Sequence, residues 1–162
     1  MINMYKITTK INLICITLIC VIIFSCNSNV FYYKNKNFTD KTWNKNDIVK
    51  FNVPINDTLK KYDFYITLRN SSDYSFMNLF VFLKTLYPDG TASQDTIELI
   101  LARPDGKWLG HGRNIIDNKI LLKKSVQFKQ VGIYSFEFIQ SMRVDELKGI
   151  EDFGIQIEEA VK

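Results

Sequence analysis

Cysteine, proline and histidine are scarce in this chain of 162 residues, which has 3 cysteines, 3 prolines and 1 histidine. All three cysteines lie at or before Cys26, so the rest of the chain has no thiol for a disulfide or a thiolate metal site. The single histidine, His111, has Gly110, Gly112 and Arg113 as its neighbours, and none of these is a carboxylate or a thiol. The sequence therefore gives no support for a metal centre or a Ser-His-Asp triad, and we expect no metal and no cofactor.

Two further enzyme classes also lack a signal. The glycine-rich stretch from Gly106 to Gly112 follows a strand pattern, but the helix that a phosphate-binding loop requires does not come after it. Acidic residues such as Asp89 and Asp105 cannot be placed opposite one another from the sequence, so paired-carboxylate hydrolysis has no positive indication. We expect a protein without enzymatic activity and without a small-molecule substrate.

Helical periodicity is also hard to find past Cys26, whereas apolar and polar residues often alternate. The clearest alternation runs from Tyr62 to Leu68, and similar patterns cover Val49 to Val53 and Tyr134 to Phe138. Turn signals separate these runs, notably Pro88-Asp89-Gly90 and Pro104-Asp105-Gly106. The pattern predicts an all-β protein, an antiparallel β-sandwich of the jelly-roll or Ig-like type with about 7–9 strands.

Three stretches carry more specific structural expectations. Val30 to Tyr33 is expected to form a short first strand, followed by a polar loop up to Trp43. Pro54 should lie at a strand end or in an edge strand. The run from Phe76 to Tyr87 is apolar at successive positions, which predicts a central strand that is covered on each side or paired deep in the sandwich.

The first residues of the chain have the pattern of an export signal. Lys6 and Lys10 precede an apolar run from Ile11 to Phe24 that is interrupted only by Asn12 and Thr17. As a helix rising about 1.5 Å per residue, this run would span roughly 21 Å. That length is shorter than the roughly 30 Å hydrocarbon core of a bilayer, so the pattern favours a cleaved signal over a transmembrane anchor.

The signal ends in Ile23-Phe24-Ser25-Cys26, which resembles the lipobox of bacterial lipoproteins. In that pattern the cysteine thiol receives diacylglycerol and becomes the new N-terminus after cleavage, and acyl chains such as palmitate then hold the protein in the membrane. The alternative is an ordinary signal peptide with a free cysteine just inside the mature chain. Lipoproteins of Bacteroidetes that travel to the cell surface often carry an acidic cluster just after the lipidated cysteine, whereas residues 27–29 include no acid. By that resemblance, we expect the protein to face the periplasm from the outer membrane rather than to lie at the cell surface.

These observations divide the chain into a signal peptide at 1–25, a lipidated cysteine with a polar tether at 26–45, and a single sandwich domain at 46–162. The lysines between Lys34 and Lys50 are interpreted as part of a solvated tether rather than as a patch for nucleic acid or anionic lipid. Lys6 and Lys10 leave with the signal, so the small net charge of +4 falls further, and no polyanionic partner is expected.

The long glycine-rich loop supplies candidate contact residues for a protein partner, Trp108 and Arg113. A glycan-binding module is the alternative, because exposed aromatic rings can stack on sugars; the candidate rings are those of Trp43, Trp108, Tyr32 and Tyr33. Packing in the core is the third interpretation of these rings.

Two tripeptides, Asp57-Thr58-Leu59 and Asp95-Thr96-Ile97, are similar to the motif at which periplasmic proteins of Bacteroidetes are O-glycosylated. Thr58 is expected in a loop and is the better candidate for modification. Thr96 is expected in a strand, where an outward-facing threonine is the simpler interpretation.

An ordered set of motifs follows the lipobox along nearly the whole mature chain. The set comprises Trp43-Asn44-Lys45-Asn46-Asp47, Leu68-Arg69-Asn70, Asn78-Leu79-Phe80, Tyr87-Pro88-Asp89-Gly90, Asp95-Thr96-Ile97-Glu98, Gly106-Lys107-Trp108-Leu109-Gly110 and Gly132-Ile133-Tyr134-Ser135-Phe136. Together they resemble the gliding motility lipoprotein GldH family. The resemblance implies an envelope lipoprotein of Bacteroidetes that works with gliding and type IX secretion proteins, and it brings no catalytic residues.

Overall fold

The computed structural model describes residues 29–160, so the expected signal peptide and Cys26 lie outside the described residues. The described chain consists mainly of β-strands. The elements are β1 (Val30–Asn37), η1 (Thr39–Lys41), β2 (Thr42–Asn44), β3 (Val49–Ile55), β4 (Lys61–Ser71), β5 (Asn78–Leu86), β6 (Ala92–Ile100), β7 (His111–Gly112), β8 (Ile115–Gln127), β9 (Gly132–Gln140), β10 (Glu146–Lys148) and β11 (Ile150–Glu159).

The all-β sandwich is confirmed, but the described residues form eleven strands rather than 7–9. The excess comes from β2, β7 and β10, which have two or three residues each. Strands of this length are too short to show alternation of apolar and polar residues, so the sequence pattern does not reveal them. The longest strand is β8, with 13 residues.

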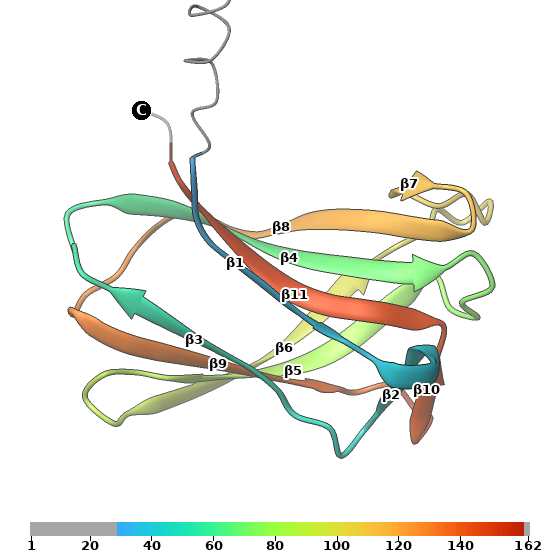
Figure 1. The fold of residues 1–162 in the computed structure, drawn as a ribbon, viewed down its shortest axis with the longest axis horizontal. Helices are drawn as coiled ribbons and strands as arrows, with labels where there is room; N and C mark the ends of the chain where they lie inside the picture. Colours follow the sequence, from blue (N-terminus) through green and yellow to red (C-terminus); the bar gives the residue numbers. More distant parts are fainter. Residues whose placement is uncertain (1–28, 161–162) are drawn as a thin grey trace, which may run out of the picture.

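The long strands form two antiparallel sheets, with the orders β1-β11-β4-β8-β7 and β3-β9-β5-β6 (Figure 1). The first half of the chain pairs with the second half in reverse order, β1 with β11, β3 with β9, β4 with β8, and β5 with β6. The chain is thus one long hairpin rolled up between two sheets, which is the jelly-roll arrangement. Of the two sandwich types expected from the sequence, the jelly roll is the one observed.

The core lies between the two sheets and is rich in aromatic rings. Side chains of β3 alternate strictly between buried and exposed, as the period-two pattern predicts. The rings of Phe64 and Phe136 lie 5.0 Å apart and join β4 to β9, and Phe138 and Phe153 join β9 to β11 at the same distance. This packing replaces the disulfides that the described part of the chain does not contain.

The two proline-glycine turns and Pro54 agree with their predicted roles. Gly90 and Gly106 have φ angles of +82° and +81°, which glycine adopts without a steric penalty. Pro54 lies in β3, an edge strand of its sheet, where the missing N–H interrupts no interior ladder.

The central position expected for β5 is confirmed, but cover on both of its faces is not. β5 lies between β9 and β6, so it is central within its sheet, but only one of its faces is covered. On the other face Phe82 is 38% exposed, and Ile100 of the neighbouring strand is 50% exposed. An uninterrupted apolar run cannot distinguish a strand buried on both faces from one whose outer face is apolar but open.

The stretch assigned to a tether also differs from expectation. Val30–Asn37 pairs along its length with β11, and Trp43 in β2 is fully buried between Phe38 and Phe153. The lysines of this stretch are exposed as predicted, but they lie on folded structure, and Lys41 forms an ion pair of 2.7 Å with Glu151. Pairing with β11 supplies the backbone hydrogen bonds that a polar sequence alone does not indicate.

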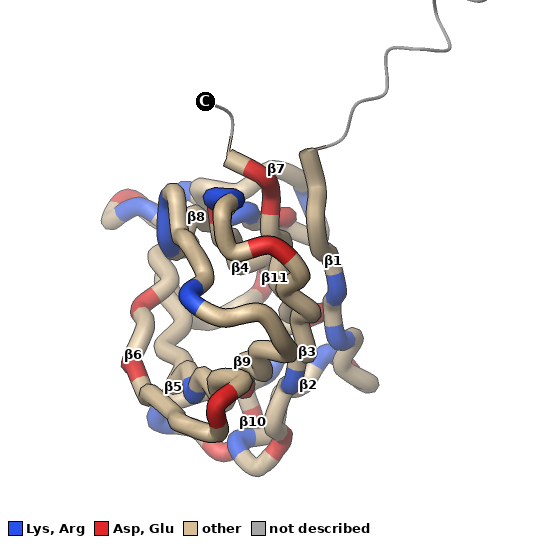
Figure 2. Tube along the Cα trace, turned by 90° about the vertical axis from the view of Figure 1, so that its left-hand side faces the viewer, with Lys and Arg blue, Asp and Glu red and all other residues tan. Residues whose placement is uncertain are grey.

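The sandwich has two distinct ends. The N-terminal end contains Val30, the loops at 56–60 and 128–131, and the β5–β6 turn at 87–91. The distal end contains the loops at 72–77, 101–114 and 141–145 together with β2 and β10. Figure 2 looks onto the N-terminal end and shows acidic and basic residues interspersed over it.

Candidate functional site

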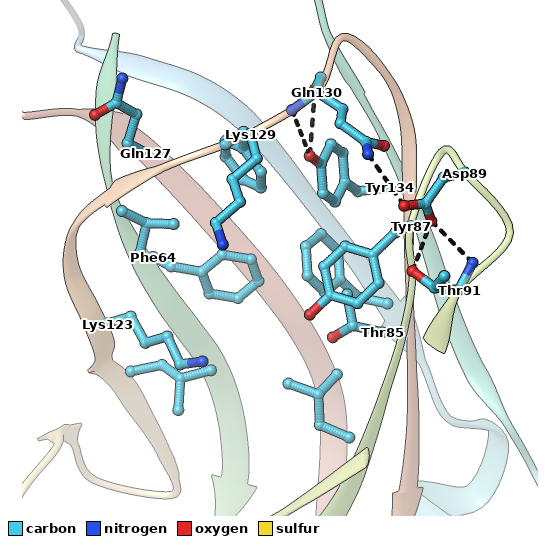
Figure 3. A pocket seen from close by; sticks show the side chains of 15 residues that line it. Phe64, Thr85, Tyr87, Asp89, Thr91, Lys123, Gln127, Lys129, Gln130 and Tyr134 are labelled. Atoms are coloured by element: carbon cyan, nitrogen blue, oxygen red, sulfur yellow. Dashed lines mark hydrogen bonds between the residues drawn. The ribbon is translucent and has the colours of Figure 1, made fainter. Parts of the chain in front are cut away.

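A cleft of about 400 Å³ opens between the two sheets at the N-terminal end. Its volume lies within the range of small-molecule sites in proteins. The cleft is lined by Phe64, Leu83, Thr85, Tyr87, Asp89, Thr91, Leu122, Lys123, Val126, Gln127, Phe128, Lys129, Gln130, Tyr134 and Phe136. These residues come from β4, β5, β8 and β9, from the β5–β6 turn and from the β8–β9 loop (Figure 3).

The floor of the cleft is aromatic. Phe64 and Phe136 are buried and meet edge to face, and Phe128 and Tyr134 meet in the same way with ring centroids 4.7 Å apart. Aromatic pairs in this geometry add about 0.5–1.5 kcal/mol beyond the burial of their area. The floor is therefore a rigid apolar surface.

Asp89 and Gln130 fix one side of the cleft. The Asp89 carboxylate accepts hydrogen bonds from the Thr91 hydroxyl at 2.6 Å, from the Thr91 backbone N–H at 2.9 Å and from Gln130 Nε2 at 3.0 Å. These bonds, above all the one from the Thr91 hydroxyl, lower the pKa of Asp89 below its ordinary value. The contact with Gln130 ties the β5–β6 turn to the β8–β9 loop.

Two lysines stand on the opposite side of the cleft. Lys123 and Lys129 extend over the apolar floor in Figure 3, and neither forms an ion pair with any other residue in 29–160. The pairing of β8 with β4 shifts register on both sides of Phe64, the residue opposite Lys123. Ser125, two residues on, has a φ of +53°, and its N–H bonds to Asp63. Such a bulge changes the direction of side chains along a strand.

Thr85 adds a polar group to the wall. It is 7% exposed, and its hydroxyl forms no hydrogen bond with another residue in the described part of the chain. Because Thr85 lines the cleft, its hydroxyl can donate or accept a hydrogen bond with a ligand there.

Sequence reasoning missed this cleft. The signals were present as Lys123-Lys124 within a strand pattern and as Phe128-Lys129 at its end, but their direction depends on the bulge. A strictly alternating strand that places Leu122 toward the core would turn Lys123 away from it.

The predicted partner-contact residues lie at the other end of the molecule. Trp108 is half-buried, bridges to Ala102 and packs on Tyr74 with ring centroids 6.5 Å apart. Arg113 is exposed in the same long loop, and Leu109 beside Trp108 is 51% exposed. The loop therefore combines an indole packed on Tyr74 with two exposed side chains, the apolar Leu109 and the charged Arg113.

The other candidates fall in several places. His111 is exposed in β7, where its partner in register is Asp117. Trp43 is fully buried, so it cannot stack on a sugar, whereas Tyr33 is 54% exposed on β1. Thr58 lies in the β3–β4 loop, and Thr96 is exposed on β6.

Within residues 29–160 no group of three or more histidines, cysteines or acids is arranged to hold a metal ion. The same residues contain no helix with the length and hydropathy needed to cross a bilayer.

Comparison with known proteins identifies the family. Residues 30–157 match the model of the GldH lipoprotein family. The chain is 33% identical over 149 residues to a gliding motility lipoprotein GldH homolog of Christiangramia forsetii, covering 86% of this chain and 91% of that protein. It is also 33% identical over 150 residues to the gliding motility lipoprotein GldH of Flavobacterium johnsoniae, covering 88% of this chain and 92% of that protein. The chain belongs to the GldH lipoprotein family.

Proposed function

We propose that the protein is a non-enzymatic outer-membrane lipoprotein that supports gliding motility and the associated type IX secretion machinery as an anchored scaffold. Cys26 is the acylated residue, and the sandwich faces the periplasm. The names of the two relatives support the link to motility, and the lipobox-like Ile23-Phe24-Ser25-Cys26 supports the anchor.

The position of Val30 carries the proposal. Only residues 27–29 separate Cys26 from Val30, and an extended chain of that length reaches about 14 Å at most. Val30 pairs with Glu158 at the N-terminal end of the sandwich. Acylation of Cys26 therefore holds that end against the bilayer and turns the distal end toward the periplasm.

The distal loop is the proposed protein-binding surface. Trp108 and Arg113 are the contact residues expected from the sequence, and Leu109 joins them through its exposure. Aromatic and arginine side chains dominate the energetics of protein interfaces. The ring of Tyr74 packs against the Trp108 indole and restricts its motion, so less conformational entropy is lost when a partner binds.

Crosslinking and pull-down of the lipoprotein from its own envelope test this function. Arg113→Glu reverses an exposed charge without disturbing the core, and we expect it to reduce recovery of the partner proteins. Lys124→Glu at the N-terminal end is the matched control, with unchanged recovery expected. If both variants recover the same proteins in the same amounts as the wild type, the distal loop is not the interface. Cys26→Ala should release the protein from the membrane fraction, and retention there would contradict the anchor.

A further inference from the structure

The cleft at the N-terminal end differs from an ordinary gap between sheets in three ways. Its floor is made of aromatic rings, its two lysines have no acidic partner among residues 29–160, and its wall carries the unpartnered Thr85 hydroxyl. All three features lie at the opposite end of the sandwich from the distal loop proposed above for protein contacts.

The charged side chains of the cleft indicate the sign of the charge that its ligand carries. Asp89 is the one acid among the lining residues, and its carboxylate already accepts bonds from Thr91 and Gln130. Lys123 and Lys129 have no such partner, so their ammonium groups are available to an anion. Charge-assisted hydrogen bonds to a carboxylate or phosphate are stronger than neutral ones.

The apolar floor indicates that the rest of the ligand is apolar. Phe64 and Phe136 offer apolar surface directly beneath the lysines, as Figure 3 shows for Phe64. A small inorganic anion would leave this surface facing water, whereas an acyl chain attached to the anion would cover it.

We propose that the cleft binds an anionic, single-tailed amphiphile, with its carboxylate or phosphate between Lys123 and Lys129 and its acyl chain against Phe64 and Phe136. The Thr85 hydroxyl supplies a further hydrogen-bonding group on the wall. The bulge that turns Lys123 over the cleft is part of this site, because unusual backbone at such a position often serves a ligand.

The location of the cleft fits such a ligand. The cleft opens at the end of the sandwich that carries Val30, and Phe31 is linked to the cleft residue Phe128 through Tyr62. With Cys26 acylated, a single-tailed lipid leaving the bilayer would meet the cleft without crossing the periplasm.

The test uses the full lipoprotein in phosphatidylcholine vesicles that contain a small fraction of a photoactivatable fatty acid. After illumination, mass spectrometry identifies the labelled peptides. We expect labelling of the peptides with Phe64 and Phe128. A photoactivatable fatty alcohol of the same length, which lacks the charge, should label them about tenfold less, the change expected for the loss of one charge-assisted bond.

Variants at exposed lysines complete the test with little risk to folding. Lys123→Gln together with Lys129→Gln should reduce fatty-acid labelling of the cleft to the level of the alcohol. Lys124→Gln, next to Lys123 but outside the cleft lining, should leave it unchanged. Equal labelling by acid and alcohol, labelling confined to the exposed loop around Leu59, or full labelling of the double variant would each overturn the proposal. The distal-loop function can fail independently, because its variants lie at the opposite end.

Discussion

Phe31 in β1 packs on Tyr62 in β4 with ring centroids 4.9 Å apart, although β11 lies between these two strands in the sheet. Tyr62 also contacts Phe128, with centroids at 5.6 Å. The first strand after the proposed lipid anchor is thus fixed into the aromatic core rather than added loosely to a sheet edge. A force applied through the anchor would be transmitted to the whole sandwich.

We predict that Phe31→Ala loosens β1 selectively. The side chain is half-buried, so the loss should be about 2 kcal/mol, below the 3–5 kcal/mol typical of a fully buried phenylalanine. Hydrogen exchange should accelerate at the amides of β1 while β3 and β9 stay protected. Tyr33→Ala, at an exposed position of the same strand, is the control and should leave the exchange nearly unchanged. Equal acceleration in both variants would show that Phe31 does not hold the strand.

Gly154 in β11 lies too close to β1 to carry a side chain. A Cβ at this position would lie 2.5 Å from the Lys34 carbonyl oxygen and 2.7 Å from the Thr67 hydroxyl oxygen. We predict that Gly154→Ala displaces β1 and lowers the free energy of unfolding by about 2–4 kcal/mol, as measured by urea denaturation.

Gly90→Ala provides the comparison for Gly154, since its Cβ would meet no atom within 4 Å and only the positive φ would be strained. The expected loss there is about 1–2 kcal/mol. A Gly154→Ala variant as stable as the wild type would mean that β1 and β11 are farther apart than described.

Asp89 should make stability at the N-terminal end depend on pH. Its pKa is lowered in the folded protein, chiefly by the Thr91 hydroxyl, so the charged carboxylate favours the folded state. This contribution is complete above the unfolded pKa of about 3.9 and is lost as the pH falls through the lower folded value. The Tm of Asp89→Asn should therefore lie below that of the wild type near neutral pH, and the gap should narrow below about pH 4. A gap that stays constant down to the acid transition would contradict the assigned role.

Thr58 is the better candidate for O-glycosylation. It lies in a loop, with its carbonyl bonded to Gln127 Nε2 and its neighbour Leu59 85% exposed. Thr58 itself is half-buried, whereas Thr96 is exposed but lies within β6. We predict that the lipoprotein purified from its native host carries a glycan mass that Thr58→Ala removes and Thr96→Ala does not. An intact mass accounted for by acyl chains alone would contradict this.

Strands in which apolar and polar residues alternate could be predicted from the sequence. Features that depend on contacts with residues far away in the sequence could not. β3, β4 and β9 lie where Val49 to Val53, Tyr62 to Leu68 and Tyr134 to Phe138 alternate. Trp43 has the polar neighbours Thr42 and Asn44, so nothing local indicates that β10 and Phe153 enclose it.

The candidate sites were predictable to different degrees. The distal loop was recognisable from Gly106, Gly110 and Gly112 around an isolated tryptophan, because glycines and an aromatic ring mark a long loop by composition alone. The cleft was not, since it depends on two loops meeting across the sheets and on a register shift in β8. Such a shift arises from pairing with β4, which no short stretch of sequence contains.

Site-specific photocrosslinking in living cells tests the anchored-scaffold account most directly. A photoreactive amino acid would be introduced either at Arg113 in the distal loop or at Leu59 in the N-terminal end, both exposed. The account predicts that position 113 forms adducts with other envelope proteins and that position 59 forms adducts mainly with lipid. Protein adducts from position 59 with none from position 113 would contradict it.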